Sequence, residues 1–85
     1  MSTAKTRYHF NIVTASETVH DLEGTELPSL EAARAYAIED ARTLMSIAVL
    51  EGRDISGRRI EVTNEAGDVL LTLRFREALT YEDGR

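Results

Sequence analysis

Two histidines and two nearby carboxylates are the residues most able to do chemistry in this chain. His9 falls in the first predicted strand and His20 in the second, and a hairpin would bring them close to Asp21 and Glu23. Imidazole nitrogens and carboxylate oxygens bind transition metals, so these four residues form a weak candidate metal site. No HExxH or comparable spacing supports it, and the simpler interpretation is polar side chains on a solvated sheet face.

The acidic turn after His20 resembles a calcium loop only loosely. An EF-hand needs oxygen ligands at alternate positions and a closing glutamate. Thr25, Glu26 and Leu27 break that pattern. A charged turn that leads into a helix explains the segment better.

Covalent catalysis has little support in the residues. The chain contains no cysteine, which excludes a thiol nucleophile, a disulfide and a thiolate metal site. Ser16, Ser29, Ser46 and Ser56 fall in a predicted turn, a cap, a helix and a loop, with no elbow motif and no evident base beside them. No GxGxxG or GxxxxGK run is present to cradle a phosphate. We therefore expect no catalytic residues and no cofactor.

One basic cluster stands out. Arg53, Arg58 and Arg59 lie close together in the sequence and form a weak candidate contact for an anion or an acidic partner. The alternative is that they are solvated and pair with Asp54 or Glu61, for well under about 1 kcal/mol each.

Composition is that of a small globular domain. The 85 residues are enough for one domain, and 42% apolar with 29% charged residues is ordinary for a folded protein. The net charge of −5 repels nucleic-acid phosphate, so we expect no nucleic-acid partner. The longest apolar run, Ile47–Leu50, is far shorter than the roughly 20 residues of a membrane span, and no targeting segment is visible. We expect a cytoplasmic protein with no membrane partner.

The elements that position the histidines are two short strands. Arg7–Val13 alternates between apolar and polar residues, which predicts a half-buried strand. Thr18–Asp21 is predicted to pair back on it as a hairpin. Gly24 then turns the chain at positive φ.

A long helix is predicted over Ser29–Glu51. Ser29 is a favoured N-cap residue, Pro28 lies just outside the helix, and Gly52 suits the C′ position. The apolar positions recur at steps of three and four, which is typical of a helix packed on a sheet. The positions at this spacing are Leu30, Ala33, Ala37, Ala41, Leu44 and Ala48, with Glu51 as the last, and Ile38, Met45 and Val49 widen the stripe.

A second hairpin follows the helix. Arg59–Thr63 and Val69–Phe75 both alternate, and a four-residue loop over Asn64–Gly67 is predicted to join them. This loop pairs Val62 with Val69 and puts the apolar residues of both strands on one face, with the last residue of the loop at positive φ.

Together these elements predict an α+β domain of ββαββ type over residues 7–79, between flexible ends at 1–6 and 80–85. One long helix covers one face of a four-stranded antiparallel sheet of order 2-1-3-4. The covered face carries Tyr8, Phe10, Ile12, Ile60, Val62, Leu71, Leu73 and Phe75. The other face is predicted to be exposed and carries His9, Asn11, Glu61, Thr63, Leu70, Thr72 and Arg74.

Four segments together resemble a family of short, uncharacterised alphaproteobacterial proteins with a domain of unknown function. The segments are YHFNI, DLEGTELPSLEAARAYA, GRDISGRRIEV and GDVLLTLRF. The resemblance implies a fold and carries no activity. A fainter resemblance, to the N-terminal domain of Hic-type antitoxins, rests on Leu30-Glu31-Ala32-Ala33. The third strand before the helix and the DNA-binding segment of those antitoxins are missing from the predicted layout.

Three hypotheses about function follow. The first is a small non-catalytic protein-interaction module, which uses an exposed sheet face and two edge strands to bind an unidentified protein partner or a second copy. The second is an antitoxin-like partner protein. The third is a metal-dependent or small-ligand-binding protein built around His9, His20 and the acidic turn.

Overall fold

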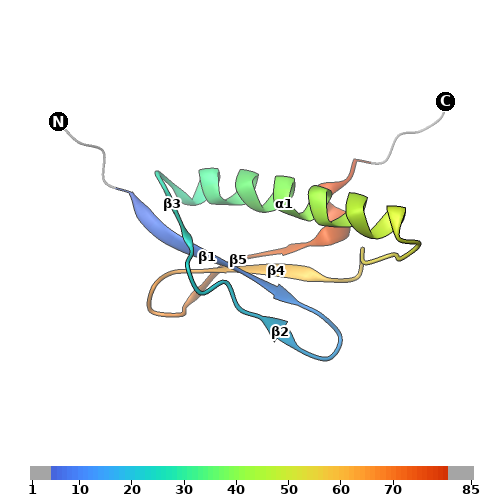
Figure 1. Cartoon of the computed structure of the whole chain (residues 1–85). Helices are drawn as coiled ribbons and strands as arrows, with labels where there is room; N and C mark the ends of the chain where they lie inside the picture. Colours follow the sequence, from blue (N-terminus) through green and yellow to red (C-terminus); the bar gives the residue numbers. More distant parts are fainter. Residues whose placement is uncertain (1–4, 81–85) are drawn as a thin grey trace.

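A computed structural model of the chain describes residues 5–80 and confirms the predicted fold class (Figure 1). One helix lies across one face of an open antiparallel sheet. The elements are β1 (Thr6–Val13), β2 (Thr18–Val19), β3 (Thr25–Leu27), α1 (Leu30–Leu50), β4 (Arg59–Thr63), β5 (Val69–Arg74) and a 3₁₀ helix, η1 (Phe75–Ala78). The predicted flexible ends lie largely outside the described residues. Within residues 5–80, no helix has the length and apolar character needed to cross a membrane.

The sheet contains one strand more than predicted. Its main order, β2-β1-β4-β5, matches the predicted order of four strands, and β3 also pairs with β1 in antiparallel register, with Tyr8 opposite Thr25. The prediction was wrong to treat Thr25–Leu27 as part of the bend into the helix. Three residues are too few for an alternating pattern to show in the sequence.

The helix packs on the sheet, as predicted, and the side chains at the contact are mostly small. Ser29 caps it by accepting a hydrogen bond from the backbone N–H of Ala32 at 3.0 Å, and Gly52 follows its end at φ +80°. The side chains that α1 buries are those of Ala33, Ala37, Ala41, Met45 and Ala48. Alanines let the helix approach the sheet closely, where Ile60, Val62, Leu73 and Phe75 are fully or almost fully buried.

The ends of the predicted helix stripe were wrong. Leu30 is 41% exposed and Val49 is 67% exposed, while Glu51 is the C-cap residue. Val49 follows the buried Ala48, and consecutive helical residues point about 100° apart, so its side chain lies on the flank of the helix.

The register of the second hairpin also differs from the prediction. Val62 lies opposite Leu71 and Thr63 lies opposite Val69, because a β-bulge adds a residue to β5. The partner of Val62 is therefore two residues further along β5 than predicted. Because side chains in a strand alternate with period two, this shift leaves the predicted inner face unchanged. Val69 is the exception, because it is 53% exposed. Gly67 has the predicted positive φ.

The face of the sheet away from α1 is less exposed than predicted. Asn11 and Thr63 are buried, and His9 is half-buried. The chain between β2 and β3 and the β4–β5 loop both lie next to this face and shelter its centre. Sequence alternation alone does not reveal such local cover.

Candidate functional site

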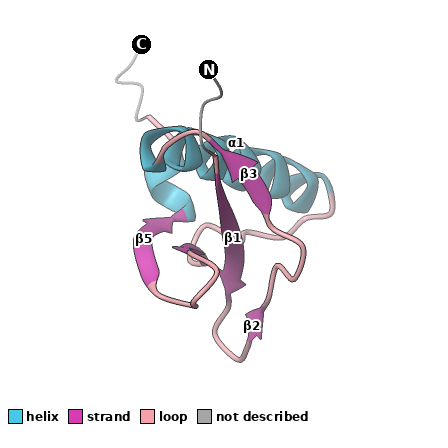
Figure 2. Ribbon diagram, turned by 90° about the vertical axis from the view of Figure 1, so that its left-hand side faces the viewer, coloured by secondary structure: helices cyan, strands magenta, loops and turns pink. Residues whose placement is uncertain are grey.

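Between β2 and β3 the returning chain leaves β1 (Figure 2). A network of polar groups connects the two segments there. The carboxylate of Asp21 accepts hydrogen bonds from the backbone N–H groups of Phe10 and Gly24, both at 3.1 Å. The backbone N–H of Asp21 donates to Oδ1 of Asn11 at 2.8 Å. We name His9, Asn11, Asp21, Gly24 and Glu65 the bulge cluster, after the break in pairing along β1 between β2 and β3, which is distinct from the bulge in β5. Its contacts satisfy backbone groups that the interrupted strand pairing leaves free.

His9 joins two loops through this cluster. Its Nδ1 lies 2.7 Å from the carbonyl oxygen of Asp21, and its Nε2 lies 3.4 Å from Oε1 of Glu65 in the β4–β5 loop. The pKa of His9 is raised, chiefly by the hydrogen bond to the Asp21 carbonyl. The hydrogen bond to Glu65 and the negative charges of Glu65 and Asp21 raise it further, while burial lowers it. The protonated imidazole can donate to both acceptors at once.

Gly24 is required by the geometry of the cluster. Its φ is +71°, and a Cβ atom there would lie 2.9 Å from the carbonyl oxygen of Tyr8 and 3.0 Å from Cε1 of His9. Both the backbone conformation and the close approach therefore favour glycine. The prediction of positive φ at this position is confirmed.

The candidate metal ligands do not converge. His9 and Asp21 meet through a ring nitrogen and a backbone carbonyl, while His20 and Glu23 are exposed. Among residues 5–80, no group of three or more His, Cys, Asp or Glu side chains is placed to hold a metal ion. The Asp21 carboxylate is already occupied by two amide donors.

The candidate anion contact is divided between two places. Arg53 pairs with Glu51 at the end of the helix, and Nε of Arg59 lies 3.4 Å from Oε2 of Glu61. A hollow beside the turn of the first hairpin contains Arg58 and Arg59, two of the three predicted arginines, together with two acidic residues. It is lined by Val13, Thr14, Ala15, Ser16, Glu17, Asp54, Ile55, Gly57, Arg58 and Arg59. The mixture of charges makes it a poor match for a free anion, and binding there stays a prediction.

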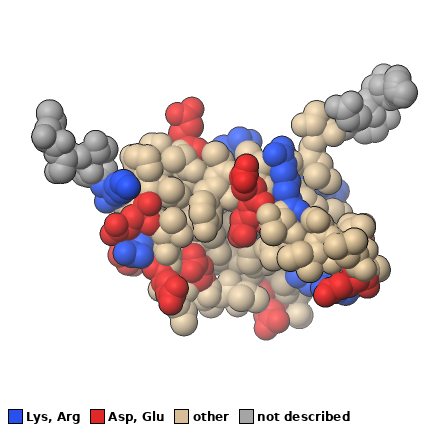
Figure 3. Space-filling view, turned by 45° about the horizontal axis from the view of Figure 1, so that its top comes forward, with Lys and Arg blue, Asp and Glu red and all other residues tan. Residues whose placement is uncertain are grey.

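A surface that the sequence analysis missed lies on the solvent side of α1 (Figure 3). Its residues follow one another at steps of four and three along the helix, and all but the first are exposed. They are Ala32, Tyr36, Glu39, Thr43, Ser46 and Leu50. We name this set the outer stripe. Only one of its members is charged, and its last member, Leu50, is 86% exposed.

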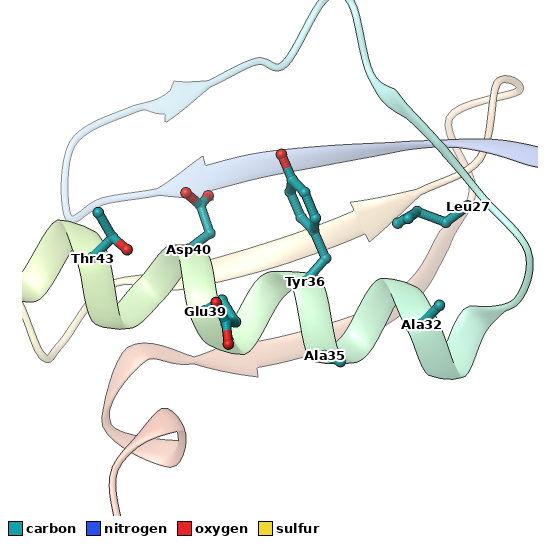
Figure 4. Close-up of a pocket in the computed structure, with 7 residues that line it drawn as sticks. All are labelled: Leu27, Ala32, Ala35, Tyr36, Glu39, Asp40 and Thr43. Carbon is teal, nitrogen blue, oxygen red and sulfur yellow. The ribbon is translucent and has the colours of Figure 1, made fainter.

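The N-terminal half of the outer stripe is hollowed (Figure 4). The hollow measures about 500 Å³ and is mostly apolar, and it is lined by Leu27, Ala32, Ala35, Tyr36, Glu39, Asp40 and Thr43. The ring of Tyr36 packs on Phe10 with a centroid distance of 4.7 Å and an interplanar angle of 39°. This contact holds the ring in place while 43% of the residue stays exposed.

Asp40 stands at the edge of this hollow. It is partly buried, and within residues 5–80 its carboxylate has neither a hydrogen-bond donor nor a cation in contact. Burial, and after it the negative charge of Asp21, raises the pKa of Asp40. The carboxylate is therefore destabilised in its charged form and would gain from a cation supplied from outside.

These features define a small α+β domain whose helix α1 carries a shallow, mostly apolar surface with acidic residues at its edge. The chain belongs to a family described as a domain of unknown function (DUF6894), whose model matches residues 7–76. The predicted membership of an uncharacterised family is thus confirmed. A search of curated proteins found no match, and a search of solved structures found none either.

Proposed function

We propose that this protein is a protein-interaction module that binds a partner segment along the outer stripe of α1. The observation that carries the proposal is the stripe itself. It runs at steps of three and four residues from Ala32 to Leu50, contains one charged residue and ends in a leucine that is 86% exposed. Recognition between helices uses this spacing of contact residues.

The shape of the stripe supports the same function. Ala32, Thr43 and Ser46 are small, so a partner backbone can approach the helix closely. Tyr36 supplies a large ring that is already fixed by its contact with Phe10, so little side-chain entropy is lost on binding. Tyrosine is among the residues that contribute most to protein interfaces.

The sheet edges, which the sequence analysis favoured, are less suited to this role. One edge of β1 is covered by β2 and β3, which are short and separated by the bulge cluster. The other edge of the sheet is β5, whose pairing with β4 is disturbed by a bulge next to Thr63. Short and bulged edges are the features by which proteins limit the addition of further strands.

A capture experiment tests the proposal. Tagged full-length protein is used to capture partners from a lysate of its own host, and the captured proteins are identified by mass spectrometry. Thr43→Arg places a long charged side chain in the middle of the outer stripe, while Thr72→Arg makes the same change at an exposed position on β5. We expect one stoichiometric partner with the wild type and with Thr72→Arg, and none with Thr43→Arg. Loss with Thr72→Arg alone would place the interface on the sheet, and no partner for any variant would contradict the proposal.

An antitoxin-like role is a second candidate, and one observation favours it. The layout predicted from the sequence lacks the third strand that Hic-type antitoxins have before the helix. The structure contains such a strand, β3, immediately before α1, which removes one of the two differences. A gene for a small basic protein beside this one, whose toxicity is relieved by co-expression of this chain, would support the role. A neutral effect of every adjacent gene product would count against it.

A further inference from the structure

The charges around the outer stripe indicate the chemistry of its occupant. Four carboxylates, those of Asp21, Glu23, Glu39 and Asp40, lie near Tyr36 on two adjoining hollows at the same side of α1. The acidic side chains that have cationic partners are elsewhere in the described part of the chain. They are Glu26, Glu51, Glu61 and Glu65.

These unneutralised carboxylates surround apolar surface. Leu27, Ala32 and Tyr36 line one hollow, while Phe10 and Val19 contribute to the next. Apolar contact with charged groups at the margin is the usual construction of a protein interface. A partner that is to fill both hollows has to supply apolar side chains and positive charges together.

Asp40 is the central element of this arrangement. It combines partial burial with proximity to a second negative charge, that of Asp21. Asp21 cannot relieve the repulsion by moving, because two backbone N–H groups hold its carboxylate. A lysine or arginine placed beside Asp40 would face both carboxylates, and the ring face of Tyr36 offers a further contact for a cation.

We infer that the occupant of the outer stripe is a cationic amphipathic protein segment. This inference rests on the proposed function and specifies its partner class. An apolar side chain of the partner enters the hollow beside Tyr36, and its lysines or arginines meet Asp40 and Glu39. The net charge of −5 favours the approach of such a segment over longer distances.

A second copy of this chain fits less well. Glu39 and Asp40 lie at the middle of α1, which spans Leu30–Leu50. Two copies paired symmetrically through the outer stripe would bring four carboxylates close to the symmetry axis. Like charges at an interface are destabilising, so the same feature that attracts a cationic partner opposes self-association.

Selection from a random-peptide phage library on the immobilised full-length protein tests this inference without assuming a sequence. We expect the selected peptides to be enriched in lysine or arginine together with leucine or aromatic residues. Amide chemical shifts of the ¹⁵N-labelled protein should then change along residues 32–50. Salt at about 1 M, where the Debye length is about 3 Å, should weaken the binding strongly.

Matched variants separate charge from fold. The double change Asp40→Asn with Glu39→Gln should weaken the selected peptides about tenfold, through loss of charge-assisted contacts. Glu17→Gln with Glu31→Gln removes the same charge from two exposed positions outside both hollows, one between β1 and β2 and one in the first turn of α1, and should change binding less than about twofold.

The possible outcomes test the cationic occupant and the proposed binding function of the outer stripe separately. Neutral or acidic peptides that still map to the outer stripe would overturn the cationic occupant and leave the proposed function standing. An equal loss of binding in both double variants would also overturn it, since only the overall charge would then matter. Peptides that map elsewhere, or no enrichment at all, would contradict the proposed function as well.

Discussion

The bulge cluster and the outer stripe both contain carboxylates, yet they use them in opposite ways. In the bulge cluster the Asp21 carboxylate accepts two backbone N–H donors, and His9 contacts acceptors on both sides of its ring. Asp40, next to the outer stripe, has no such partner within the described chain, and burial raises its pKa. Polar groups that complete the fold are already satisfied, whereas those available to a partner are left without one. This contrast favours a structural role for the bulge cluster and supports the outer stripe as the proposed binding surface.

The largest expected effect concerns the glycine at the centre of the bulge cluster. Gly24→Ala should lower the free energy of unfolding by about 3 kcal/mol, because positive φ and a contact of 2.9 Å with the Tyr8 carbonyl oxygen both oppose a Cβ atom. Gly52→Ala is the matched control, since its φ is +80° but no atom lies within 4 Å of its Cβ position. It should cost only about 1 to 2 kcal/mol. If urea denaturation gives the same loss of unfolding free energy for both variants, the close approach at Gly24 does not contribute to stability.

The second expected effect compares the two aspartates directly. Asp21→Ala leaves the N–H groups of Phe10 and Gly24 without acceptors and should cost about 2 kcal/mol. Asp40→Ala removes no hydrogen bond within residues 5–80 and should change stability by less than about 0.5 kcal/mol. Thermal and urea unfolding of both variants measures the difference. A large loss at Asp40 would mean that this residue, too, supports the fold.

His9 provides a pH-dependent form of the same comparison. Because its pKa is raised in the folded state, its contribution to stability is fully present below the unfolded value of 6.5 and is lost as the pH rises through the folded value. The stability difference between wild type and His9→Gln should therefore be larger in mildly acidic solution than in alkaline solution. A difference that does not change across this range would indicate that the imidazole acts only through packing.

Asp40 should show the same direction of pH dependence as His9 but as a destabilisation by its charged form, and its effect should be the smallest. A carboxyl whose pKa is raised on folding makes the protein lose stability as the pH rises from its unfolded value of 3.8 to its folded value. Asp40→Asn removes this contribution, so the gain of the variant over the wild type should appear across that interval and then stay constant. Stability curves of the two proteins at matched pH values measure it. An advantage of the wild type at neutral pH would contradict the assignment of Asp40 as a strained, unpartnered charge.

Local signals were sufficient to predict most of the fold. Ser29 and Gly52 bound the helix, and the alanine stripe identifies its buried side. The fold class, the order of four strands and the turn at Gly24 follow from alternation and glycine placement. The strand β3 and the bulge next to Thr63 were missed, because a strand of three residues and one inserted residue leave no periodic signal.

The candidate site was less accessible to sequence reasoning. The spacing of Ala32, Tyr36, Thr43 and Leu50 is visible in the sequence, but the stronger alanine stripe on the same helix dominates the pattern. The proximity of Asp40 to Asp21 cannot be deduced from spacing, because one lies on α1 and the other in the turn after β2. Tertiary contacts create this site.

The most direct test is a chemical-shift map of the ¹⁵N-labelled protein on addition of its captured partner. If the helix surface is the binding site, the largest amide changes will fall on α1 between Ala32 and Leu50, with a further change at Leu27. The amides of His9, Asn11 and Thr63 will change little, since their polar neighbours are already satisfied within the fold. Changes centred on those three residues, with α1 unaffected, would place the interaction at the bulge cluster and contradict the account.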